Sequence, residues 1–313
     1  MKINSQTIRE SLLNEREVEY KDELSKKRIW TVIIMILTAS FVLYVYIHGS
    51  LIDEASMSSN FREKLMGPSI SHIFGTDHAG RDMYLRTVKG LSTSLKVGFI
   101  GTISSFLISI IFCVLLVVGK EKTDFVVNFL IDGFLSVPHM MFLILISVAV
   151  GRGIRGVIIG LALTHWTGLT RILRSEILEL MDENYIHISK AMGKSNFYIF
   201  KNHILPHLLP QIVVGLMLLF PHAILHEAGI TFLGFGLSLS TPAIGIILQE
   251  SMKYISTGHV YLALLPGLML VLLVLCINSL GENLKSFLDP NEIHRWYYAT
   301  ISKKIKYIIW TIY

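Results

Sequence analysis

Two histidines and a glutamate within a long apolar run are the residues of this chain best suited to bind a ligand. His222 and His226 are four residues apart in the stretch "FPHAILHEAG", and Glu227 follows directly. Residues four apart lie on one face of a helix, so the two imidazoles could hold one divalent metal, with Glu227 rotated by about 100°. In the alternative interpretation they hydrogen-bond to neighbouring helices or shape a kink after Pro221.

Other polar residues also interrupt apolar runs. Asp132 and His139 flank Pro138, and each is a candidate for a hydrogen bond between helices or for a transport pathway. An ionisable group at the centre of a bilayer costs about 2.5–3.5 kcal/mol on insertion scales, so each one requires a reason. His165 and Trp166 are expected to anchor the end of a span at the membrane interface. The candidates for the pathway or its gating are Asp132, His139, His222, His226 and Glu227.

The elements that must position these residues are membrane-spanning helices. Of the 313 residues, 52% are hydrophobic and only 16% are charged, and the mean hydropathy is +0.57. Soluble proteins average about 25% charged residues, and a spanning helix needs roughly 20 apolar residues. The chain is therefore predicted to be an all-α polytopic membrane protein with six transmembrane helices. The expected spans are 29–48, 96–119, 126–150, 154–169, 208–235 and 259–282.

The distribution of Lys and Arg predicts the orientation. With six spans, the tails and two loops that share one side carry 19 of these residues, and the opposite side carries 8. Because cytoplasmic loops are enriched in Lys and Arg, both termini are expected in the cytoplasm of a bacterial cell. The net charge of +5 is explained by this bias and requires no nucleic-acid partner.

The resulting layout has five parts. These are a cytoplasmic amino tail (1–28), a first transmembrane helix (29–48), an external segment (49–91), a core of five transmembrane helices (92–283) that includes a cytoplasmic loop (170–207), and a cytoplasmic carboxyl tail (284–313).

The cytoplasmic loop 170–207 is predicted to form two short helices. Gly193 is expected to end the first one in a left-handed conformation, and Ser195 or Asn196 to cap the second, which ends before Pro206 and Pro210. The tripeptide "GKS" at 193–195 is no phosphate-binding loop, because Ile188 stands where that motif requires glycine. The chain itself is not expected to bind ATP.

Four ordered motifs carry a resemblance to a known family. They are "FGTDHAGRD" (74–82), the "HILP" ending of the cytoplasmic loop, "ITFLGFGLSLSTPAIGIIL" (230–248) and "LGENLKSFLDP" (280–290). In this order they are similar to the integral-membrane permeases of ATP-binding-cassette (ABC) importers, in the dipeptide/oligopeptide/nickel group. The chain departs from the Glu-Ala-Ala triplet of that family's cytoplasmic loop, where it has His187, Ile188 and Ser189.

The resemblance implies a type-1 ABC-importer permease architecture, with loop 170–207 coupling the spans to an ATPase. The coupling residues implied are His187, Ile188, Ser189, Ala191, Gly193, Ile204, Leu205 and Pro206. Those of the external motif are Gly75, Asp77, Gly80, Arg81 and Asp82. The side chains of Asp77, His78, Arg81 and Asp82 either pair with one another around a glycine turn at Gly80 or contact a substrate-delivering protein, and the helix that follows is expected to begin near Asp82.

The same resemblance implies no enzyme and no cofactor on this chain, since ATP and Mg belong to separate subunits. The implied partners are a second homologous permease, two cytoplasmic ABC ATPase subunits, an extracytoplasmic solute-binding protein and the lipid bilayer. "HAILHEA" is similar to the nickel branch of the group, which favours a transition metal or a metal–metallophore complex as substrate.

Three alternatives stand beside this interpretation. The first is an importer of dipeptides or oligopeptides. An intramembrane metalloenzyme built on His222, His226 and Glu227 is less favoured, because a third ligand at motif spacing is missing. A secondary transporter is less favoured because we find neither an internal inverted repeat nor paired broken helices.

Overall fold

The computed structural model describes residues 29–288, which form helices joined by turns and one isolated bridge between Thr76 and Asp82. Five of these helices are long and apolar enough to cross a membrane, and a bent helix pair gives a sixth span if it is counted as one. The predicted all-α polytopic fold is confirmed. The candidate spans are Ile29–Leu51, Met83–Gly119, Ile154–Met181, Asn196–Phe232 and Tyr261–Ser286, with the bent pair Thr123–Leu135 and His139–Val150.

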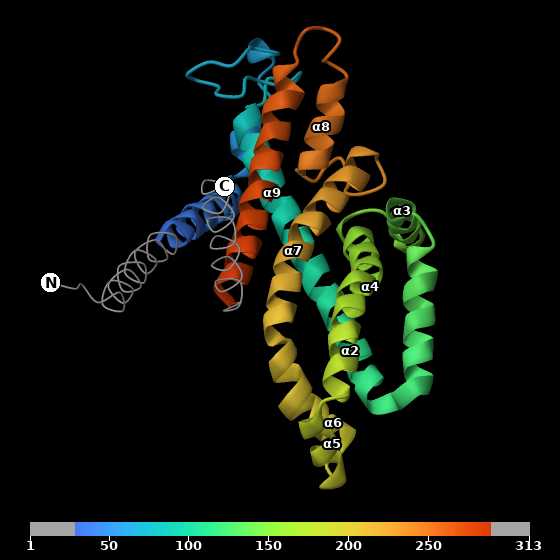
Figure 1. The fold of residues 1–313 in the computed structure, drawn as a ribbon. Coiled ribbons are helices and arrows are strands. Elements are labelled where there is room, and N and C mark those ends of the chain that lie inside the picture. The colour runs from blue at the N-terminus through green and yellow to red at the C-terminus, as the bar shows by residue number, and fades with distance from the viewer. Residues whose placement is uncertain (1–28, 289–313) are drawn as a thin grey trace, which may run out of the picture.

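Helix α2 (Met83–Leu135) turns back on itself, so that its return limb, Thr123–Leu135, runs in the opposite direction to its first limb (Figure 1). The return limb meets α3 (His139–Val150) at 93°. Pro138 explains this break, because proline lacks the N–H of a helical bond and pushes the preceding residue out of the helical conformation. The span predicted at 126–150 is therefore two helices at a right angle.

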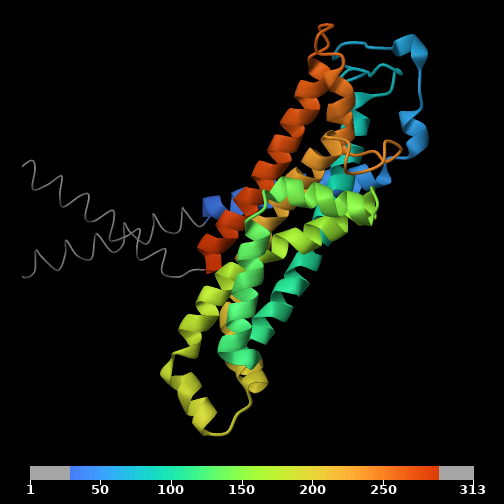
Figure 2. The same cartoon turned by 90° about the vertical axis from the view of Figure 1, so that its right-hand side faces the viewer.

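In the first half of residues 170–207, the structure differs from the two short helices predicted there. Helix α4 (Ile154–Met181) runs well past the predicted end at 169, and a short α5 (Asn184–Ala191) follows after a turn at Asp182. Gly193 has φ +77°, and the Ser195 side chain accepts a hydrogen bond from the Tyr198 N–H, so the predicted glycine stop and serine cap are both confirmed. We call residues 182–204 the elbow; it lies at one end of the molecule (Figure 2).

The second half of the loop also corrects the sequence interpretation. Helix α6 (Asn196–Ile199) does not end before the prolines but continues through a π-helical turn (Phe200–Ile204) into α7 (Leu205–Phe232). In the π turn the Leu205 N–H bonds to the Phe200 carbonyl, five residues back. Pro206 follows directly after this turn, where the regular bonding to the residue four positions back is already interrupted, so the helix tolerates the missing N–H.

The opposite end of the molecule carries the segment between the N-terminal helix (Ile29–Leu51) and α2 (Figures 1 and 2). Helix α8 (Ile244–Met252) and the turn that leads to α9 (Tyr261–Leu288) lie at the same end. Two 3-10 turns, Glu54–Met57 and Phe61–Glu63, shape this segment. Helix α8, which packs against α2, α7 and α9, has no counterpart among the predicted elements.

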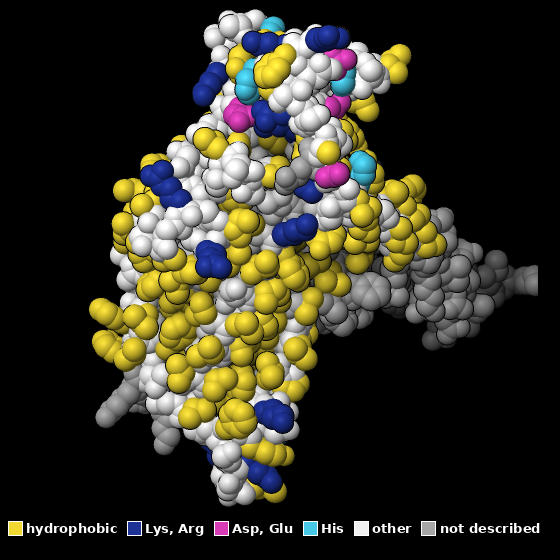
Figure 3. Space-filling view, turned by 180° about the vertical axis from the view of Figure 1, so that it is seen from behind, with side chains coloured by type: hydrophobic (Ala, Val, Ile, Leu, Met, Phe, Trp, Pro, Cys, Tyr) yellow, Lys and Arg dark blue, Asp and Glu magenta, His cyan; other side chains and the backbone are white. Residues whose placement is uncertain are grey.

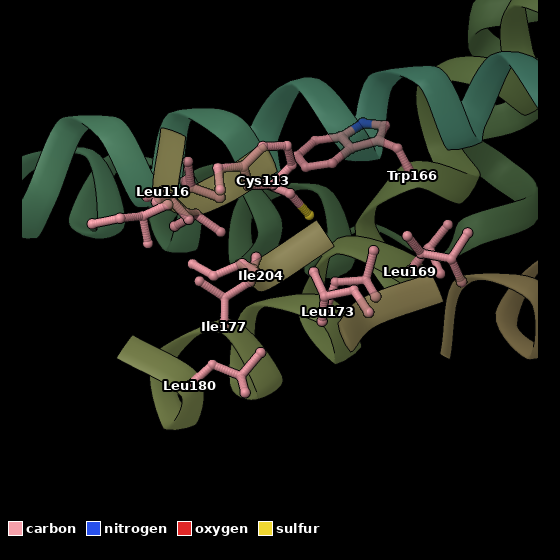
Figure 4. Close-up of a cluster of buried hydrophobic side chains, with 14 of the residues drawn as sticks. Cys113, Leu116, Trp166, Leu169, Leu173, Ile177, Leu180 and Ile204 are labelled. Carbon is pink, nitrogen blue, oxygen red and sulfur yellow. The ribbon is translucent and has the colours of Figure 1, made fainter. Parts of the chain in front are cut away.

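The largest buried apolar cluster lies between α2, α4, the elbow and α7 (Figure 4). It includes Cys113, Leu173, Ile177, Ile186 and Ile204, none of them more than 1% exposed. Outside the core, apolar side chains cover the middle of the face shown in Figure 3, and charged side chains gather toward its two ends. This is the surface distribution expected of a protein that crosses a bilayer.

Candidate functional site

Three histidines from three helices converge inside the molecule. The ring centroids of His139 on α3, His165 on α4 and His226 on α7 are separated by 4.6 Å (139–165), 4.7 Å (139–226) and 5.0 Å (165–226). One nitrogen from each ring lies within 4.8 Å of the other two. We call these three residues the histidine cluster.

A chain of hydrogen bonds orients the cluster. The Thr164 hydroxyl donates its proton to the Gly160 carbonyl at 2.9 Å, so it accepts from His165 Nδ1, 3.0 Å away. We therefore assign the proton of neutral His165 to Nδ1, which leaves a lone pair on Nε2. That Nε2 accepts a hydrogen bond from His226 Nδ1 at 2.9 Å.

The sequence interpretation missed His165 as a member of this site. His165 was expected at the membrane interface with Trp166, but the two side chains are only 5% and 3% exposed. Trp166 stacks on Phe112 instead, with ring centroids 4.3 Å apart. The expectation fails because position along a span does not reveal which face of the helix is packed.

His222 lies apart from the cluster. Its side chain is exposed, and its ring centroid is 6.4 Å from that of His226. The four-residue spacing thus places the two rings on one side of α7, but His226 makes its hydrogen bond to His165 on another helix. The structure joins His226 to a histidine 61 residues away in sequence, which spacing rules cannot detect.

Glu227 is fully buried, and its hydrogen bonds stabilise the turn that follows α7. Its Oε1 accepts a hydrogen bond from Thr231 Oγ1 at 2.9 Å, and the same hydroxyl accepts from the Leu237 N–H at 3.2 Å. The Glu227 carboxylate does not belong to the group of potential metal ligands formed by the histidine cluster.

Asp132 forms an ion pair between the return limb of α2 and α4. Its Oδ1 lies 2.9 Å from Arg171 Nη2, and Asn128 donates to its Oδ2 at 2.9 Å. Both charged side chains are 57% exposed, although both helices are candidate spans. Nearby, Arg174 pairs with the less exposed Asp124.

A buried charge network fixes the external motif. Asp77 is 3% exposed and accepts from Arg81 Nε at 2.7 Å and from Arg86, which also pairs with Glu250 Oε2 at 2.8 Å. Burial alone would raise the pKa of Asp77, but the Arg81 N–H and the charges of Arg86 and Arg81 outweigh it and lower that pKa below 3.8. The predicted self-pairing of Asp77 and Arg81 is confirmed.

The remaining residues of the external motif build its turns. Gly75 and Gly80 have φ +72° and +75°, and a Cβ on Gly80 would lie 1.7 Å from the Asn60 carbonyl oxygen. Asp82 caps α2 by accepting a hydrogen bond from the Leu85 N–H at 3.0 Å, and it also contacts His72 Nδ1 at 2.8 Å. The predicted glycine turn and helix start are both confirmed.

The elbow has one packed side and one open side. Ser189 and Ile204 face inward, Leu205 is half-buried, and the Ser189 Oγ–His203 Nε2 distance of 3.0 Å joins α5 to the π turn. The other predicted coupling residues are exposed: His187, Ile188, Ala191, Gly193 and Pro206. The apolar side chains of Ile188, Met192 and Phe197 are 60%, 72% and 58% exposed.

Comparisons with known proteins define the class. Residues 105–291 match the family described as "Binding-protein-dependent transport system inner membrane component". A chain in the inward-facing crystal structure of the MetNI methionine ABC transporter has the same fold, with a TM-score of 0.51, 21% identity and coverage of 66% of this chain and 98% of that chain. This protein belongs to that transport family: it is a multi-pass inner membrane permease subunit of an ABC importer, which works with an ATPase and a binding protein.

Individual relatives narrow the group to peptide and nickel permeases. The chain is 30% identical to the dipeptide transport system permease protein DppC of Bacillus subtilis, over 85% of this chain and 83% of that protein. It is 31% identical to DppC of Alkalihalophilus pseudofirmus, over 85% and 87%. It is 28% identical to the nickel transport system permease protein NikC of Escherichia coli K12, over 74% and 83%. The chain is a transport subunit and not an enzyme.

Proposed function

We propose that this permease carries short peptides. The observation that carries the proposal is that the two DppC relatives match more of the chain, at higher identity, than NikC does. The nickel interpretation depended on His222 and His226, and His226 contacts His165 instead. The comparisons therefore favour the peptide alternative over the metal substrate expected from the sequence.

An exposed ion pair inside the candidate spans supports the same proposal. Lipid around Asp132 and Arg171 would make two exposed charges costly, so we place them on a water-filled pathway between this chain and a second, homologous permease. A pathway wall with one charge of each sign suits a zwitterionic peptide, whose ammonium and carboxylate groups have complementary charges.

The elbow is the proposed contact with a cytoplasmic ATPase subunit. Ile188, Met192 and Phe197 present apolar surface at the far end of the molecule, where a partner protein would cover it. The buried cluster behind them ties the elbow to α4 and α7, so a push on the elbow would move both helices as a rigid body. In this arrangement two ATPase subunits, closing on ATP, drive the change between inward-facing and outward-facing states.

The proposed orientation follows from the elbow. It places the elbow and both termini in the cytoplasm and the Asp77 network outside, where the solute-binding protein delivers substrate. The Lys and Arg distribution supports this direction.

The test of the substrate is an uptake assay. Labelled dipeptide and labelled nickel, with and without a metallophore, are supplied to cells that lack this chain and to cells complemented with it. Loss of dipeptide uptake alone in the deletion strain is the expected result. Loss of nickel uptake alone, with dipeptide uptake intact, would reject the peptide proposal and restore the metal interpretation.

A further inference from the structure

We propose that His139, His165 and His226 bind one late first-row divalent metal ion, as a resident ion that ties α3 to α4 and α7. Three imidazoles with one open position are a ligand set that suits Zn²⁺, Co²⁺, Ni²⁺ and Cu²⁺. The site differs from the His222–His226 pair expected from helical spacing, since it draws one ligand from each of three helices.

The spacing of the nitrogens fits such an ion. Metal–nitrogen bonds of about 2.0–2.1 Å place the nitrogens of a tetrahedral site about 3.3 Å apart. His165 Nε2 and His226 Nδ1 are already 2.9 Å apart, with one proton between them. A metal ion takes the place of that proton, which moves to Nε2 of the same His226 ring, so no oxidant or reductant is involved.

The His139 ring has one nitrogen without a hydrogen-bond partner among the described residues. Its Nε2 is buried and makes no hydrogen bond among the residues that the structure describes. A buried polar nitrogen without a partner is costly, and native structures rarely retain one without a reason. One nitrogen of the His139 ring already lies within 4.8 Å of a nitrogen of each of the other two rings, so a small rotation of the ring brings a His139 nitrogen to bonding distance of the shared ion.

The surroundings prepare His165 as a ligand. The Thr164 hydroxyl accepts a hydrogen bond from His165 Nδ1–H, which fixes the ring and leaves the Nε2 lone pair aimed at the cluster. Such an outer hydrogen bond typically accompanies a metal-binding histidine and determines its tautomer.

The position of the cluster indicates a resident ion, not cargo. His165 is 5% exposed and Nε2 of His139 is shielded from solvent, while the His139 and His226 side chains are half-buried, so an ion here lies between the helices and is only partly open to solvent. All three helices meet beside the right-angle break at Ser136–Pro138, where α3 leaves the return limb of α2. An ion at this point would hold α3 against α4 and α7.

The experiment measures Co²⁺ binding by visible absorption in the complete transporter, purified without a histidine tag and stripped of metal with a chelator. The wild type is compared with His139→Asn, which removes a nitrogen that makes no hydrogen bond, and with His222→Ala, a control one turn away on α7. We expect the intense absorption of a tetrahedral Co²⁺ site in the wild type and in His222→Ala, and binding at least tenfold weaker in His139→Asn.

A second measurement distinguishes metal binding by this chain from metal binding by the other subunits. Zn²⁺ is expected to raise the unfolding temperature of this chain in the wild type and in His222→Ala but not in His139→Asn. Equal Co²⁺ binding by wild type and His139→Asn would overturn the proposal, as would loss of binding in His222→Ala alone. Neither measurement uses a transport substrate, so the result does not depend on the peptide proposal.

Discussion

Arg174 and Asp124 form two parallel hydrogen bonds, from Nε to Oδ1 and from Nη2 to Oδ2, each 2.7 Å long. The pair joins α4 to the start of the return limb of α2, with both side chains about one-quarter exposed. A planar guanidinium can make this paired contact and a lysine cannot. The two helices next to the elbow are thus held in a defined register.

Arg174→Lys should therefore destabilise the chain although it conserves the charge. We expect a loss of about 0.5–1 kcal/mol, measured by thermal unfolding of the purified transporter. Arg171→Lys is the matched control, because its single contact with Asp132 is 57% exposed and should contribute little. Equal unfolding temperatures for wild type and Arg174→Lys would show that the paired geometry does not stabilise the fold.

Asp77→Asn should destabilise the end of the molecule opposite the elbow in a pH-dependent way. The change removes one of the two carboxylate partners of the buried Arg86, which keeps only Glu250, and breaking a buried pair costs about 3 kcal/mol. Because the folded pKa of Asp77 lies below its ordinary value of 3.8, its contribution is complete above that value and is lost as the pH falls through the folded pKa.

The corresponding measurement is the difference in unfolding temperature between wild type and Asp77→Asn, followed from neutral pH to below pH 4. The difference should be constant near neutrality and shrink at the acid end. Asp53→Asn, an exposed carboxylate in the same segment, is the control and should show little difference at any pH. A difference that grows toward acid would contradict the assigned ion pair.

The sequence predicted the local features of this fold because their signals are local. The left-handed Gly193, the Ser195 cap and the helix start at Asp82 each depend on one residue type and its immediate neighbours, and all three are present. Continuous apolar runs likewise located the spans. These features need no knowledge of what packs against them.

The features that sequence reasoning missed depend on contacts distant in the chain. The bond between His165 and His226 links residues 61 positions apart, and no periodicity reports it. Pro206 and Pro210 were read as helix stops, but the π turn before them lets the helix continue. Pro138, by contrast, does break its helix, so the residue type alone does not decide the outcome.

Whether water reaches the Asp132–Arg171 pair can be tested by cysteine labelling. The test uses a chain in which Cys113 and Cys276 are replaced by serine. If the pair lines the pathway, Arg171→Cys should react with a water-soluble maleimide at least tenfold faster than Ile172→Cys. Ile172 is the matched control, because it neighbours Arg171 on α4 and is similarly exposed, at 55%. Thiolates react only where water reaches them, so the ratio reports the environment.

The same pair should matter for transport. Arg171→Gln is expected to lower dipeptide uptake several-fold while the amount of assembled transporter in the membrane is unchanged. Equal labelling of the two cysteines would place Arg171 outside an aqueous pathway. Normal uptake by Arg171→Gln would remove the pair from the transport mechanism, whatever its exposure to water.

Gly193 offers the most direct test of the elbow. Its φ of +77° is a conformation that glycine adopts freely and asparagine tolerates, whereas a β-branched residue pays about 1–2 kcal/mol. A Cβ added there would meet no atom within 4 Å, so the effect of a substitution comes from the backbone and not from a clash. Gly193→Val should therefore distort the turn between α5 and α6 without disturbing the buried cluster.

We expect Gly193→Val to reach the membrane at the wild-type level but to lose most substrate-stimulated ATP hydrolysis in the assembled transporter. Gly193→Asn should retain that activity, because asparagine can occupy the same conformation. The comparison separates turn geometry from the mere loss of a glycine. Full stimulation in Gly193→Val would mean that the ATPase does not depend on the shape of the elbow, and the proposed contact would then have to lie elsewhere on the chain.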